Sequence, residues 1–310
     1  MADQPTFPGS TYAGMAAGKY ISAALLSAPT IENGGVTVLE NVKGKSVLQT
    51  IDTNDLFQDA TCDFDETRTV TMGESILTVK DMQVNLQLCR SQFHDTFSAI
   101  EMGASAFADI PKSFEDYLLG YVASKVAASN ETLLWTGVNG ANAYDGIVTL
   151  LNAAGLPAAQ DIASVASTAA NVIDEMGKVI DAIPTTVYGS EDLKLYCTSN
   201  IARNYVRALG GFAAAGLGAN GTDNKGTQWY TNGSLSFDGI PVFVANGLAD
   251  NSMVAAQTSN LYFGTSLLSD WQEASVIPVH LYDGSDNVRI VMRMQVGAQV
   301  GIANDCVVYS

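Results

Sequence analysis

The C-terminal part of the chain carries a long alternation of apolar and polar residues. From Val288, apolar side chains occupy every second position through Ile302, while Arg289, Arg293 and Gln295 fall in the opposite phase. A two-residue period predicts one β-strand with a single buried face. Ordinary strands rarely exceed about 10 residues, so the pattern indicates an elongated, plate-like subunit better than a compact enzyme core.

Two amphipathic stretches predict helices in the middle of the chain. Apolar residues keep a three-to-four-residue spacing over 113–135, and Gly137 ends the pattern. Ser113 and Asp116 have the spacing of an N-terminal capping box. A helix of this length would be roughly 35 Å long. A second helix is predicted over 161–183, where Pro184 stops it.

The remaining segments are dominated by strand and turn patterns. Residues 1–34 predict an extended arm, and residues 35–88 have β texture with a hairpin turn near Gly73. Further on, the sequence predicts a buried strand in LKLYCT and a short helix capped by Ser199, followed by a flexible glycine-rich loop over 210–233. The turn dipeptides Asp238-Gly239 and Asn246-Gly247 lie on either side of the strand segment in GIPVFV, and the strand segment NLYFG follows before the long final strand.

The order of these elements resembles the major capsid proteins of tailed bacteriophages with the Hong Kong 97 fold. The resemblance rests on the run of turn, GIPVFV, turn, NLYFG and long return strand, and on the long helix before it. The ending NETLLWTG at 130–137 is similar to an E-x-x-x-W-x-G ending found in capsid proteins of phages infecting Bacteroidetes.

The resemblance implies an α+β fold with a defined domain order. It implies an N-terminal arm over 1–34, an extended loop over 35–88, a peripheral domain over 89–184 with a spine helix over 113–135, an axial domain over 185–284, and a return strand over 285–310.

The resemblance also implies a mechanical function. Copies would assemble through pentamers and hexamers into an icosahedral virion shell around double-stranded DNA, built in the host bacterial cytoplasm with a portal and a separate scaffolding protein as partners. An encapsulin-type nanocompartment shell protein is the alternative with the same fold. A secreted adhesin and an enzyme are disfavoured, the first because no basic leader precedes the chain and the second because no titratable residues converge.

Composition fits a self-associating surface. Charged residues make up 15% of the 310 residues, below the roughly 25% of ordinary soluble chains. The net charge of −17 argues against a dedicated nucleic-acid reader. It fits either an acidic wall along which packaged DNA slides or the solubility of the free subunit. Four separated cysteines predict reduced thiols, with a bridge between Cys62 and Cys89 as the lesser alternative.

No catalytic, cofactor-binding or metal-binding residue is assigned, and no membrane span is expected. The two histidines, His94 and His280, lack a nucleophile motif nearby. Several motifs resemble ligand sites but lack the required spacing or context: the glycine motifs at 14–19, 44–46 and 216–221, the acidic clusters at 63–67 and 283–287, and the sequons at Asn130, Asn220 and Asn232. Lys43 and Lys45 predict a solvated hairpin tip, with no crosslinking chemistry assigned.

Overall fold

The fold was examined in a computed structural model of the chain. It describes residues 29–53, 59, 62, 70–89, 112–209, 235–266, 274–279, 284–285 and 287–310, with the side chains of 52–53, 112–120, 274–276 and 278 left aside. The chain divides into two compact units. Unit 1 comprises 1–27, 81–129 and 266–295, and unit 2 comprises 28–80, 130–265 and 296–310.

Unit 1 contains a helix and a sheet within its described residues. The long helix α2 spans Lys112–Thr136 and continues into unit 2 from Asn130. The strand β12, Asn287–Val300, pairs antiparallel with β11, Ala274–Pro278, and also pairs with β4, Lys80–Cys89. The alternation seen in the sequence is present in β12, where Ile290, Met292 and Met294 are buried and Arg289 and Arg293 are exposed.

Unit 2 is built around a mixed six-stranded sheet. Its order is β5-β13-β9-β6-β8-β7. The strands are β5, Asp161–Ile162; β6, Leu193–Cys197; β7, Ser236–Phe237; β8, Ile240–Val244; β9, Met253–Gln257; and β13, Val307–Tyr309. The turn between β7 and β8 is the expected Asp238-Gly239, and both residues have positive φ.

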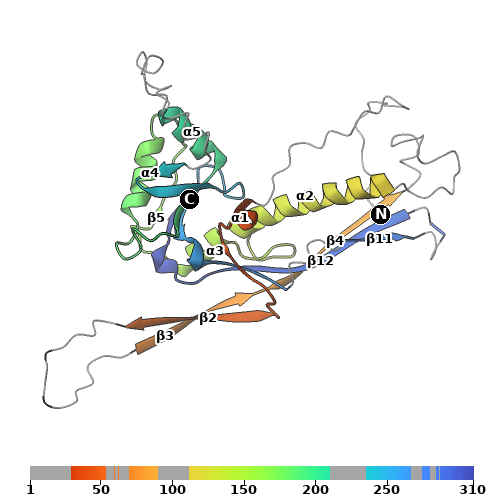
Figure 1. The fold of residues 1–310 in the computed structure, drawn as a ribbon, viewed down its shortest axis with the longest axis horizontal. Coiled ribbons are helices and arrows are strands. Elements are labelled where there is room, and N and C mark those ends of the chain that lie inside the picture. Colours follow the sequence, from red (N-terminus) through yellow and green to blue (C-terminus); the bar gives the residue numbers. More distant parts are fainter. Residues whose placement is uncertain are drawn as a thin grey trace. The chain divides into compact units, whose positions relative to one another are not determined.

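One face of this sheet carries the main core of unit 2. The helices α4, Val172–Asp181, and α5, Ser199–Leu209, lie beside it (Figure 1). Their apolar sides join alternate residues of the central strands, namely Met176, Val179, Ile201, Tyr205, Leu193, Leu195, Cys197, Met253, Ala255, Val307 and Tyr309. A third helix, α3, Ile147–Ala154, contacts β13 and buries Ile147 and Leu151.

The remaining elements of unit 2 are shorter. They are α1, Pro29–Glu32; β1, Thr37–Leu39; β10, Leu261–Thr265; and the 3₁₀ turns η3, Thr258–Asn260, and η5, Ala303–Asp305. β10 pairs parallel with β1 and antiparallel with the Val296–Val300 end of β12. β2, Lys45–Thr53, and β3, Val70–Thr78, form an antiparallel two-stranded ribbon of their own (Figure 1).

The helix predicted over 113–135 is α2, but it begins at Lys112, so Ser113 lies inside the helix and is not its cap as predicted. Three other sequence predictions were wrong. The helix predicted over 161–183 begins only at Val172, because residues 161–162 form β5 beside β13. The hairpin turn near Gly73 does not exist, since Gly73 lies within β3 opposite Thr50. Ser199 is not the cap of α5, because the helix already includes it and Ala202 N donates to Thr198 O.

None of the four cysteines forms a disulfide, so the alternative of a Cys62–Cys89 bridge is wrong. Cys197 and Cys306 are buried, and burial raises the pKa of each thiol to about 12. Residues 1–28 of the predicted arm and the glycine-rich loop predicted over 210–233 lie outside the described residues.

Candidate functional site

The β2–β3 ribbon presents an apolar surface that no other described part of the chain covers. We call the exposed side of the two strands the ribbon face; its apolar members are Val47, Ile51, Val70, Met72 and Ile76, which are between 42% and 66% exposed. Val47 is the register partner of Ile76, and Ile51 is the partner of Met72. Cross-strand partners point to the same side of a ribbon, so these residues lie on one face, with Val47 and Ile76 on one side of the Gln49–Glu74 pair and Ile51, Met72 and Val70 on the other.

The opposite side of the ribbon is attached to unit 2. Leu77 is fully buried, while Ser46, Leu48, Thr50 and Ser75 are half-buried. Ser75 Oγ donates to the carbonyl oxygen of Gly301 over 2.9 Å. The two sides therefore differ in role, because one side anchors the ribbon and the other leaves bulky apolar side chains in water.

Such a patch is typical of a surface that binds another protein. Scattered exposed apolar residues are normal on a folded chain, but a contiguous set on paired strands marks an interaction site or an aggregation liability. Gln49 and Glu74, which are register partners within the ribbon face, add hydrogen-bonding groups between the apolar pairs. The chemistry available here is burial of apolar area and not a reaction.

A second candidate site is buried at the C-terminal end of α2. Glu131 and Thr30 are fully buried, and Thr30 donates to the Glu131 carboxylate through both its hydroxyl and its backbone N–H, the latter over 3.3 Å. Trp135 Nε1 donates to the Thr30 hydroxyl oxygen over 3.0 Å. Glu131 and Trp135 are four residues apart on a helix, so both reach the same side. We call Thr30, Glu131, Trp135 and Gly247 the arm anchor.

Gly247 completes the arm anchor by close approach. A side chain at this position would overlap the Glu131 carbonyl and would lie 2.9 Å from Trp135 Cδ1. The Gly247 backbone donates a hydrogen bond to the Glu131 carboxylate. Burial raises the pKa of Glu131, and hydrogen bonds from Thr30, Trp135 and Gly247 oppose that rise. Unpaired burial of such a carboxylate would cost several kcal/mol, so these donors are needed to keep it inside the protein.

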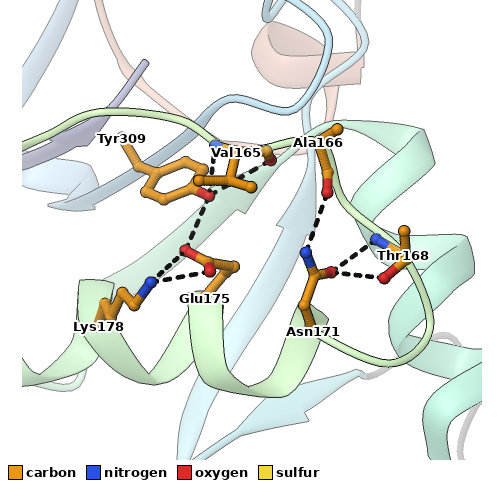
Figure 2. A network of polar contacts seen from close by, with 7 residues as sticks. All are labelled: Val165, Ala166, Thr168, Asn171, Glu175, Lys178 and Tyr309. Carbon is orange, nitrogen blue, oxygen red and sulfur yellow. Dashed lines mark hydrogen bonds and ion pairs between the residues drawn. The ribbon is translucent and has the colours of Figure 1, made fainter.

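The third candidate site is a polar network that holds the chain before α4 (Figure 2). Tyr309 donates to Glu175 Oε2 over 3.0 Å, and its hydroxyl also accepts from Val165 N over 2.8 Å. Lys178 forms an ion pair with Glu175 at 2.8 Å. Asn171 Oδ1 accepts from the backbone and hydroxyl of Thr168. These bonds give residues 163–171 a fixed non-helical path, which explains the late start of α4.

This third network has no sign of a reactive centre. Its hydrogen bonds from Lys178 and Tyr309 lower the pKa of Glu175, whereas a general acid at neutral pH needs a raised one. Tyr309 has a raised pKa because it is buried. The network is a structural support for the C-terminal strand.

The motifs considered in the sequence do not converge on a reactive site in the described part of the chain. His94, His280, the clusters at 63–67 and 216–221, and the sequons at Asn220 and Asn232 lie outside it. Asn130 is buried and accepts from the Tyr144 hydroxyl, which excludes glycosylation in the folded chain. Gly44 forms a turn with positive φ before Lys45 opens β2. Within the described ranges, no group of His, Cys, Asp and Glu could hold a metal ion.

Sequence reasoning singled out the NETLLWTG ending but missed its partner. Glu131 and Trp135 are the glutamate and tryptophan of that ending. Thr30 lies 101 residues before Glu131, and no local pattern could pair them. None of the described helices is long and apolar enough to span a bilayer.

Comparison with known proteins identifies the fold. No protein-family profile and no curated protein sequence matches this chain. Solved structures do match over nearly all of it. The capsid of a native GTA particle superposes with a TM-score of 0.62 at 13% identity, covering 98% of this chain and 95% of that one. The chain has a phage-capsid fold.

Two further structures support the same fold. The capsid of Myoviridae phage XM1 matches with a TM-score of 0.56 at 13% identity, covering 93% of this chain and 94% of that chain. A structure from Microbacterium phage Oxtober96 matches with a TM-score of 0.57 at 13% identity, covering 94% of each chain. These likenesses extend over almost the whole chain, so they concern its fold and not a single motif.

Proposed function

We propose that this chain is the major capsid protein of a tailed double-stranded DNA bacteriophage. Many copies assemble through pentamers and hexamers into an icosahedral shell of the Hong Kong 97 type. The observation that carries the proposal is the ribbon face, which exposes paired apolar side chains on a chain with a capsid fold. A shell subunit needs such a surface, because it buries in the assembly what it exposes alone.

The domain order expected from the sequence forms part of this proposal. The arm over 1–34 and the extended loop over 35–88 make contacts between subunits, and the peripheral domain over 89–184, the axial domain over 185–284 and the return strand over 285–310 form the body of the subunit. Several modest contacts at different edges hold a subunit at high effective concentration. The chain is a structural protein and not an enzyme.

The partners of the shell follow from the same assignment. Copies of the chain bind one another, a portal and a separate scaffolding protein take part in assembly, and the shell encloses DNA without reading its sequence. The net charge of −17 fits a wall that does not grip phosphates. The virion capsid, assembled in the host bacterial cytoplasm, is the proposed location, and a Bacteroidetes host is suggested by the NETLLWTG ending alone.

Electron microscopy of the purified protein tests the proposal directly. Negative-stain images should contain shells or capsomer rings, and their number should rise with protein concentration. A chain that remains monomeric at high concentration, with and without the proteins encoded beside it, would contradict the proposal. An encapsulin-type shell is the alternative, and the phage-capsid matches do not favour it. Particles filled with a cargo enzyme instead of DNA would reverse that choice.

A further inference from the structure

Residues 29–35 contact the body of unit 2 through a small number of buried groups. Thr30 is fully buried and Gly35 is buried, whereas Glu32, Asn33 and Gly34 between them are exposed. The segment closes on itself through a 2.7 Å hydrogen bond from Gly35 N to Thr30 O. It is therefore a short loop that docks by its two ends, like a bound peptide.

Each end of this loop has its own partner on a different element. Thr30 enters the arm anchor at the end of α2, where the Glu131 carboxylate accepts both of its hydrogen-bond donors. At the other end, the hydroxyl of Tyr196 on β6 donates to Gly35 O over 2.5 Å. Lys194 Nζ, also on β6, donates to Gly34 O over 2.9 Å.

The side-chain chemistry at Thr30 is selective. Thr30 and Gly247 direct hydrogen-bond donors at the Glu131 side chain. A carboxylate, whose oxygens only accept hydrogen bonds, therefore fits position 131 best. The Thr30 hydroxyl must donate to Glu131 and accept from Trp135 at once. A hydroxyl is the one small side-chain group that can do both, so the site takes threonine or serine and rejects valine or alanine.

We infer that Glu131, Trp135 and Gly247 form a receptor site that holds the Pro29–Gly35 segment on unit 2. Thr30 is the group that the site recognises. The site is buried, but its residues are not members of the core cluster that α4, α5 and the six-stranded sheet form. The Glu131 and Trp135 positions of the NETLLWTG ending are thereby explained by binding.

Proteolysis of the unassembled chain tests this inference locally. Glu32 is exposed but lies in α1, so a glutamate-specific protease cuts after it only when the docked loop opens. Thr30→Val keeps the shape of the side chain and removes the hydroxyl. It should raise the rate of cleavage after Glu32 about tenfold or more, the factor expected for loss of a hydrogen bond to a charged group. Thr30→Ser, the matched control, should cleave like the natural chain.

The receptor side gives an independent measurement. Glu131→Gln places an amide N–H₂ among donors and should raise cleavage after Glu32 to a similar extent. In the Thr30→Val/Glu131→Gln pair the two effects should be clearly non-additive, because both remove the same contact. Thermal unfolding of each variant should stay cooperative, with the far-UV spectrum unchanged.

Two results would overturn the receptor assignment. One is equal cleavage after Glu32 in Thr30→Val and Thr30→Ser. The other is a fully additive double variant, which would mean that Thr30 and Glu131 act separately.

If Thr30→Val instead unfolds the whole chain, hydrogen exchange in the Thr30→Ser and Trp135→Phe variants decides the question. Trp135→Phe should then expose the amides of 29–36 selectively, and uniform loss of protection over unit 2 would place the segment in the core. Shell formation does not enter any of these readouts.

Discussion

Gly264 on β10 and Gly297 on β12 are register partners, and the end of β3 passes directly over both of them. A Cβ at Gly264 would lie 2.5 Å from Leu77 Cδ2, and one at Gly297 would overlap the Thr78 carbonyl oxygen. The two adjacent glycines thus leave a surface without side chains on β10 and β12, and the end of the β2–β3 ribbon packs against it. Leu77, which is fully buried, fills that place.

Substitution at these glycines should weaken the attachment of the ribbon. Gly297→Ala pushes against backbone and should lower the free energy of unfolding by about 1–3 kcal/mol, toward the upper end of that range. Gly264→Ala meets a side chain that can rotate and should cost less. Gly177→Ala is the matched control, because nothing lies within 4 Å of its Cβ in helix α4. It should stabilise the chain by roughly 0.5–1 kcal/mol. Urea unfolding of the three variants measures the order of their stabilities. Equal losses of stability in Gly264→Ala and Gly297→Ala would contradict the prediction.

The ion pair and hydrogen bond at Glu175 predict a loss of stability in acid. Hydrogen bonds from Lys178 and then Tyr309 lower the folded-state pKa of Glu175 below its usual value of 4.5. As pH falls, the unfolded chain therefore takes up the proton first. The stabilisation is complete above about pH 4.5 and declines as pH falls through the lower folded-state pKa.

The measurement compares the natural chain with Glu175→Gln from pH 7 to pH 3. At pH 7 the variant should be less stable by about 1–2 kcal/mol, mostly through its weaker bond to Tyr309, since the half-exposed Lys178 contributes little. The gap should narrow below pH 4.5. Lys178→Met leaves the bond from Tyr309 to Glu175 in place. Its loss of stability at pH 7 relative to the natural chain should therefore be smaller than that of Glu175→Gln. A gap that is constant with pH would mean that Glu175 does not titrate as proposed.

The buried thiols should be inert in the folded chain. Burial raises the pKa of Cys197 and Cys306 to about 12, so at pH 8 almost no thiolate is present to react. Cys62 is exposed and is accessible to reagent. A thiol reagent with mass-spectrometric readout should label Cys62 in the native chain, and Cys197 and Cys306 only after denaturation. Labelling of Cys197 before unfolding would show that β6 is less protected than its burial implies.

Long periodic segments could be read from the sequence, and segments fixed by distant contacts could not. The pattern over 113–135 agrees with α2 within one residue at each end, and the alternation from Val288 became β12. The helix predicted over 161–183 was wrong at its start, because β13 supplies a strand partner for Asp161 and Tyr309 holds Val165. Apolar spacing alone does not register such contacts.

The two candidate sites illustrate the same limit. The ribbon was predicted as β structure, but Gly73 was taken as a turn, since glycine is usual in turns. Its register opposite Thr50 depends on β2, more than twenty residues away. The arm anchor joins Thr30 to Glu131 across 101 residues. The E-x-x-x-W-x-G spacing showed that the end of α2 was special but could not show what it binds.

The ribbon face should matter for assembly and not for folding. Ile51 and Met72 are register partners, each 66% exposed, so replacing both by threonine removes apolar area that the single chain does not bury. Threonine retains a high strand propensity. The melting temperature of the monomer should therefore stay nearly unchanged, because surface substitutions usually alter stability by less than about 0.5 kcal/mol. The yield of shells should fall sharply, because the surface that a neighbouring subunit covers has lost its apolar groups.

A control on the same face separates apolar burial from any disturbance of the ribbon. Gln49→Thr changes a polar residue between the apolar pairs, and its register partner is Glu74. This variant should melt and assemble like the natural chain. Particle counts by electron microscopy, taken beside melting temperatures for the same preparations, give the comparison. If Ile51→Thr/Met72→Thr lowers the melting temperature and the particle count together, the ribbon face is packed within the subunit. If it changes neither, the ribbon face does not join the subunits and another surface does.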